Sequence, residues 1–152
     1  MAERTTATPA TSRLEAFAGP PPEGRDVHPR VALVSAAVDA LHVAVFAVIG
    51  RAAHAEALTL GGWVRTAWPF LAGLVLGYLA LHLLRRQHSP ASLVSGVAVW
   101  LWTAAGGLLL RAVTGQGTAL PFVIVALTVL ALLLLAWRAI VAMVLRQQTR
   151  RA

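Results

Sequence analysis

Hydrophobic residues in this chain are gathered into four long blocks separated by short polar segments. The blocks cover residues 31–50, 67–84, 91–110 and 119–145. A helix needs about 20 residues to cross the roughly 30 Å of hydrocarbon in a bilayer, and the blocks have this length or more, within a few residues. Membrane-spanning strands would be about ten residues long and would alternate in polarity, which no block does. The pattern therefore predicts an all-α, integral membrane four-helix bundle.

The segments outside the blocks are polar and have no helical periodicity. Residues 1–28 are rich in Thr, Pro, Gly and Ala and include the run Gly19–Pro22, which cannot be helical. We expect a disordered cytoplasmic tail there, a transmembrane domain over residues 29–146, and a short cytoplasmic tail over residues 147–152.

Two matching segments indicate an internal repeat. Thr66–Phe70 (TAWPF) and Thr118–Phe122 (TALPF) open the second and fourth blocks. In each segment the threonine suits a helix N-cap and the proline suits the first turn. An arginine lies 17 residues after the proline in both copies, at Arg86 and Arg138. We interpret this as two tandem, parallel-related two-helix hairpins, with chance recurrence as the alternative.

Composition agrees with a membrane location and argues against several kinds of chemistry. Hydrophobic residues make up 58% and charged residues 12% of the chain, which is more apolar than a soluble domain of this size can bury. Cysteine is absent, and the histidines lack the spacing of metal ligands. No nucleophile motif, phosphate loop or dinucleotide fingerprint is present. We therefore expect no enzyme activity, no cofactor and no metal.

The basic residues predict an orientation. All 13 are arginines, the net charge is +7, and they form no continuous stripe, so we expect no nucleic acid partner. Nine lie in the two tails and in the loop after the second block, whereas Arg51, Arg65 and Arg111 lie on the opposite side. The positive-inside rule then predicts a multi-pass protein of the cell membrane with both termini in the cytoplasm.

Four ionisable residues lie inside the blocks at similar depth: Asp39, His42, His82 and Arg138. Asp39 is about nine residues into its helix, roughly 13 Å deep, where an unpaired carboxylate costs at least a few kcal/mol. We expect the four to form one buried polar cluster. Such a cluster is either a proton relay for transport or a structural ion pair that fixes helix register. In a different placement, Arg138 extends to the membrane interface instead.

A second candidate site lies at the opposite end of the bundle, at Arg51, His54, Arg65 and Arg111. Two predicted helices begin at this end, and their positive dipole ends favour anions. We expect these residues to bind an anionic lipid headgroup or a small anion. Ordinary anchoring of arginines at the interface is the alternative.

Several of these residues together resemble a known family. They are Asp39, Phe46, Gly50, Arg51, His54, Pro69, Phe70, Arg111, Pro121, Phe122, Trp137 and Arg138. Over residues 31–141 the chain resembles domain-of-unknown-function family 3054, a group of small prokaryotic membrane proteins. The resemblance implies four membrane helices and assigns no activity.

Two functions of different classes fit these expectations. The first is a small proton-coupled transporter or channel-like protein, with Asp39 and His82 as coupling groups. Four helices are few to enclose a pathway, so a homo-oligomer would serve this function best. The second is a lipid-binding or accessory protein, which assists assembly in the bilayer without transport.

Overall fold

The computed structural model describes residues 29–53, 59–83 and 89–151, which fold into four helices. These are α2 (Pro29–Ala53), α3 (Leu60–Leu83), α4 (Leu93–Val113) and α5 (Leu120–Arg151). All four are long and apolar enough to cross a membrane. The prediction of an all-α four-helix membrane bundle is confirmed, while the predicted tail over residues 1–28 lies outside the described residues.

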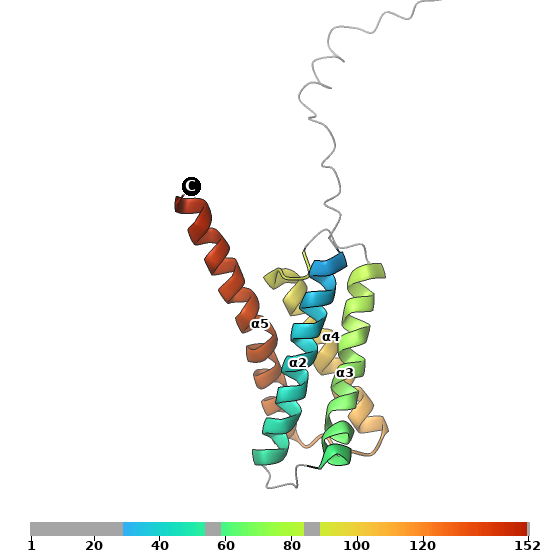
Figure 1. Cartoon of the computed structure of the whole chain (residues 1–152). Coiled ribbons are helices and arrows are strands. Elements are labelled where there is room, and N and C mark those ends of the chain that lie inside the picture. Colours follow the sequence, from blue (N-terminus) through green and yellow to red (C-terminus); the bar gives the residue numbers. More distant parts are fainter. Residues whose placement is uncertain (1–28, 54–58, 84–88, 152) are drawn as a thin grey trace, which may run out of the picture.

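The helices form a ring in which consecutive helices run antiparallel (Figure 1). α3 packs against α2 and α4, and α5 packs against α4 and closes the ring on α2. The contact between α3 and α4 is the most extensive, and that between α2 and α5 is the least extensive. We call the end where α2 and α4 begin the termini end, and the opposite end the hairpin end.

Glycines allow α3 and α4 to approach each other closely. A Cβ atom on Gly73 would lie only 2.7 Å from the carbonyl oxygen of Thr103. One on Gly106 would lie 3.1 Å from the Cα of Gly73, and one on Gly77 would lie 3.1 Å from the Cβ of Trp102. Small residues at such a contact let two backbones meet directly, which is how membrane helices gain packing energy without a hydrophobic driving force.

The core between the helices is apolar and lies toward the hairpin end. The Phe46 and Phe70 rings meet edge to face at 5.1 Å, and the Phe70 and Phe122 rings are 6.3 Å apart. Val43, Leu74, Val99, Leu130 and Leu134 fill the space around them. By contrast, large apolar side chains on the outside of all four helices are exposed. A bilayer is the solvent that suits such a surface.

The second helix begins seven residues earlier than predicted. Its first turn follows Thr59, whose hydroxyl accepts a hydrogen bond from the Gly62 amide at 3.2 Å. Thr66 therefore lies within α3 and donates to the Gly62 carbonyl, and the expected cap there is wrong. Pro69 is interior to the helix instead of in its first turn. Neighbouring helices in a membrane protein stabilise such a proline.

The last helix is longer than predicted. α5 continues to Arg151, so residues 147–151 prolong the helix instead of forming a separate tail. This stretch contains no glycine or proline, and its arginines and glutamines are good helix formers. At the start of α5, Thr118 lies two residues before Leu120 and is not the residue that directly precedes the helix. Beyond its middle, α5 leans away from the other three helices (Figure 1).

Candidate functional site

The fold brings Asp39 of α2 and Arg138 of α5 together inside the bundle. Both side chains have no exposed surface. Arg138 continues a stripe of buried residues on α5, Leu130 and Leu134, which recurs every four residues and faces the bundle. The depth of Asp39 and the periodicity of α5 thus place opposite charges at one level.

Four hydrogen bonds saturate the Asp39 carboxylate. Arg138 binds it in bidentate fashion, with Nη1 at 2.8 Å from Oδ1 and Nη2 at 2.7 Å from Oδ2. The Trp137 indole N–H donates to Oδ1 at 2.9 Å, and the Tyr78 hydroxyl donates to Oδ2 at 2.8 Å. A carboxylate offers about four lone-pair positions, so all of them are used. Bidentate, charge-assisted bonds of this kind are among the strongest in proteins.

The Arg138 guanidinium is saturated as well. Nη1 also donates to the Leu134 carbonyl at 2.6 Å, and Nη2 and Nε donate to the Pro90 carbonyl at 3.2 and 3.3 Å. The Tyr78 oxygen accepts a further bond from Nη2 at 3.3 Å. The guanidinium carbon lies 4.4 Å from the centre of the Trp137 ring, which adds a cation–π contact. These bonds engage all three guanidinium nitrogens and offset the cost of burying the charge.

The start of α4 provides the space and one acceptor for Arg138. Ser92 caps this helix by accepting a hydrogen bond from the Ser95 amide at 3.2 Å, which fixes the turn that contains Pro90. A Cβ atom on Gly96 would lie 2.5 Å from Cδ of Arg138, so the arginine stem crosses α4 where a side chain is missing. We define the polar cluster as Asp39, Tyr78, Trp137 and Arg138, supported by Pro90 and Gly96.

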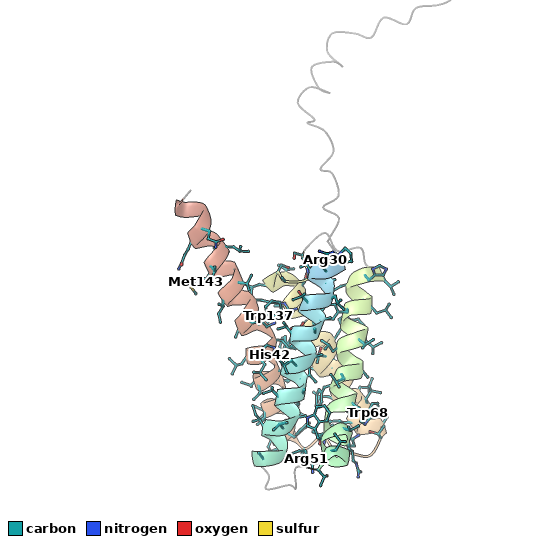
Figure 2. The ribbon with its side chains drawn as sticks, viewed as in Figure 1. Arg30, His42, Arg51, Trp68, Trp137 and Met143 are labelled. Carbon is teal, nitrogen blue, oxygen red and sulfur yellow. The ribbon has the colours of Figure 1, made fainter. Side chains whose placement is uncertain are left out.

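The polar cluster differs in membership from the expected one. Asp39 and Arg138 belong to it, and the placement of Arg138 at the interface is wrong because its side chain is fully buried. His42 is half-buried, and its Nδ1 lies 2.8 Å from the carbonyl of Val38 on its own helix (Figure 2). His82 is exposed near the end of α3. The spacing of three residues from Asp39 predicted His42 near the site, and a similar depth predicted His82 there, but the rotation of their helices turns both away from it.

Tyr78 and Trp137 complete the cluster in place of the histidines. Tyr78 is the only tyrosine in the chain and lies four residues before His82, one turn deeper in α3. The signal available in the sequence was a single tyrosine one turn from His82, inside an apolar block that also had to provide partners for Asp39. In the sequence, Trp137 is marked only by the family resemblance, which implies no role for its indole N–H.

At the hairpin end, Arg51 turns toward α3 (Figure 2). Its Nη1 lies 3.5 Å from the Thr66 hydroxyl, and its guanidinium covers Gly62, where a Cβ atom would collide with it. Arg65 is exposed on α3, and His54 lies outside the described residues. Arg51 is therefore held within its own hairpin, in the last turn of α2, where its charge complements the helix dipole.

Arg111 is held in the second hairpin in a comparable way. Its Nη1 and Nη2 donate to the side-chain and main-chain oxygens of Gln116, both at 3.1 Å, and its guanidinium stacks 4.4 Å from the Phe122 ring. The connection can fold back because Gly115 and Gly117 adopt φ values of 68° and 77°. An anion site at these arginines remains a prediction.

Four apolar helices, two of which are joined by a saturated internal ion pair, define a small multi-pass membrane protein. Across residues 29–53, 59–83 and 89–151 no three His, Asp or Glu side chains gather as metal ligands would. The chain belongs to the family described as "Protein of unknown function (DUF3054)", which matches residues 36–141, more than half of its length. The resemblance inferred from the sequence is thereby confirmed. No curated protein and no solved structure matches the chain.

Proposed function

We propose that this chain is an accessory protein of the cell membrane, which acts by binding at its lateral surface and carries no substrate through its interior. The main support is the saturation of the ion pair. Asp39 and Arg138 have no exposed surface, and their polar atoms are engaged inside the bundle. A coupling site has to exchange a proton or an ion with both sides of the membrane, and a saturated pair has no position left for one.

The core on the hairpin side of the polar cluster supports the same proposal. One turn from Asp39, Val43 is fully buried, and Phe46 and Phe70 follow in edge-to-face contact. Leu130 and Leu134 close the α5 side of this layer. A transport pathway through the bundle would have to open this packed layer, which is costly because protein interiors are close-packed.

The orientation remains the one predicted from the arginines. The described part of the termini end carries Arg30 at the start of α2 and Arg146 near the end of α5. Because positive residues favour the cytoplasmic side, we propose that the termini end faces the cytoplasm. The test is accessibility of single cysteines, introduced at either end into this cysteine-free chain, to an impermeant thiol reagent in intact cells. Labelling of the termini end from outside would contradict the orientation.

A proton-flux experiment tests the absence of transport. The full chain is reconstituted into liposomes that contain a pH-sensitive dye, and a pH gradient and a membrane potential are imposed in turn. We expect the proton flux of the wild type and of Asp39→Asn to equal that of empty liposomes. A flux that appears with the wild type and is lost in Asp39→Asn would overturn the proposal.

Photo-crosslinking in cells tests the binding role. Leu41, Val75, Leu109 and Leu132 provide one apolar position on each helix, with side chains 63%, 65%, 65% and 63% exposed. A photoreactive residue at each position samples the four outer faces under matched conditions. We expect adducts of defined mass on one or two neighbouring helices only. Equal labelling of all four faces, or labelling of none, would contradict a specific binding surface.

Proton-coupled transport is the second candidate. The observation that favours it is Tyr78, which is half-buried and contacts both charges of the pair, so that it links the cluster to the edge of the bundle. The same flux experiment decides between the two candidates, with Tyr78→Phe as an additional variant. Transport predicts that this variant slows the flux, whereas the accessory role predicts no flux to slow.

A further inference from the structure

A groove of about 370 Å³ opens between the first turn of α4 and the far part of α5. It is lined by Leu93, Ala139, Ala142, Met143, Arg146 and Gln147. The groove lies at the termini end, beyond the polar cluster and separate from it. Figure 2 shows Met143 on the part of α5 that leans away from the other helices.

The groove exists because α5 leaves the bundle while its inward stripe continues. Leu134 and Arg138 are fully buried on this stripe. The next positions at the same spacing of four are Ala142 and Arg146, which line the groove. The alanine side chain is small, so the widening gap stays open.

The chemistry of the groove changes along its length. Its deeper part is apolar, with Ala139, Ala142 and Met143 on α5. Arg146 lies directly after the last apolar residue of the helix, about 12 Å beyond Arg138 along the axis. The apolar stretch of α5 ends here, and in membrane helices such an end marks the change from hydrocarbon to headgroups. The first turn of α4, where Leu93 lines the other wall, presents the positive end of its dipole toward the termini end.

We infer that this groove binds one anionic phospholipid, with an acyl chain along its alanines and the phosphate at Arg146. An apolar slot that ends in a cation at headgroup depth complements both parts of such a lipid. A zwitterionic lipid would also fill the slot, but its headgroup cation offsets the attraction between its phosphate and the arginine. The inference is independent of the accessory role, because a transporter could hold the same lipid.

Native mass spectrometry of the full chain tests the inference. Delipidated protein in a mild detergent is titrated with phosphatidylglycerol or phosphatidylcholine, both carrying palmitoyl and oleoyl chains. We expect one phosphatidylglycerol to bind about tenfold more tightly than phosphatidylcholine, as one charge-assisted contact predicts. Arg146→Gln should reduce it to the phosphatidylcholine level, and Ala142→Leu, which fills the slot, should weaken both lipids about tenfold.

Two matched variants control for general effects on the protein. Arg30→Gln removes an exposed arginine at the start of α2, which does not line the groove, and Ala136→Leu enlarges an exposed alanine of α5 away from the groove. Both should bind lipid as the wild type does. Equal binding of the two lipids to the wild type, or a preference that survives Arg146→Gln, would overturn the inference. Unchanged lipid binding combined with loss of a dimer in Ala142→Leu would assign the groove to a second copy of the chain.

Discussion

Asp39 and Arg138 lie 99 residues apart in the chain and meet in a bidentate ion pair that closes the ring of helices. The pair joins α2 to α5, the two neighbours with the least extensive contact. On the opposite side of the ring, α3 and α4 are joined by close backbone packing at Gly73. In the proposed repeat, α2 and α3 correspond to α4 and α5, so the contact between α3 and α4 is equivalent to the contact between α5 and α2. Close packing at glycine holds the first contact, and the ion pair holds the second.

Breaking the ion pair should destabilise the protein far more than replacing it. Asp39→Asn or Arg138→Gln alone leaves a buried charge without its partner, which costs about 3–5 kcal/mol. The double variant Asp39→Leu, Arg138→Met removes both charges and should recover most of that loss. The measurement is the free energy of unfolding in detergent micelles. Additive losses in the double variant would contradict a mutual ion pair.

Gly96→Ala should destabilise the protein through Arg138. The added methyl group would lie 2.5 Å from Cδ and 3.0 Å from Nε of the arginine, which has to shift away from Asp39. We expect a loss of about 1–3 kcal/mol in the free energy of unfolding. Gly50→Ala is the control, because its methyl group meets nothing within 4 Å and should stabilise α2 by up to about 1 kcal/mol. Equal effects of the two substitutions would show that the space at Gly96 is not needed.

The four-helix architecture and the pairing of Asp39 with Arg138 could be predicted from the sequence, because the alternatives to each cost too much free energy inside a membrane. Long apolar blocks have few stable arrangements other than spanning helices. A carboxylate as deep as Asp39 requires a partner, and Arg138 was the only basic residue within a block. The predicted start of α3 was wrong. The pair Gly61–Gly62 resembles a loop in the sequence, but in the structure it lies in the first turn of the helix that follows Thr59.

Which other residues join the polar cluster depends on how each helix is rotated about its axis. A sequence block that is apolar on all sides gives little information about this rotation. His82 and Tyr78 are four residues apart on α3, and only the packing of α3 against α4 decides which of them faces Asp39. Gly96 and the Pro90 carbonyl carry no sequence signal of their own, since their role is to leave space and to accept a bond. These contributions follow from three-dimensional packing and not from residue type.

Tyr78→Phe should show what the hydroxyl contributes to the polar cluster. It removes one hydrogen bond to a buried carboxylate and leaves the ring in place, so we expect a loss of about 1.5–3 kcal/mol in the free energy of unfolding. Thr128→Val deletes an exposed hydroxyl that bonds only the Ile124 carbonyl of its own helix, and it should change stability by less than about 0.5 kcal/mol. If both variants are equally stable, the Asp39 carboxylate does not need its fourth donor.

Gly73→Ala should separate α3 from α4. Its methyl group would lie 2.7 Å from the Thr103 carbonyl oxygen, and backbone atoms cannot move aside as a flexible side chain can. The helices therefore have to part, at a cost of about 1–3 kcal/mol in the free energy of unfolding. Gly61→Ala lies on the same helix with nothing within 4 Å, so the gain in helix propensity should leave it neutral or slightly stabilised. Because α4 also carries Gly96, moving α4 away from α3 should weaken the contacts that position Arg138. The double variant Gly73→Ala, Asp39→Asn should therefore lose less free energy of unfolding than the sum of the two single losses. Strict additivity would instead show that the glycine contact and the ion pair close the ring independently.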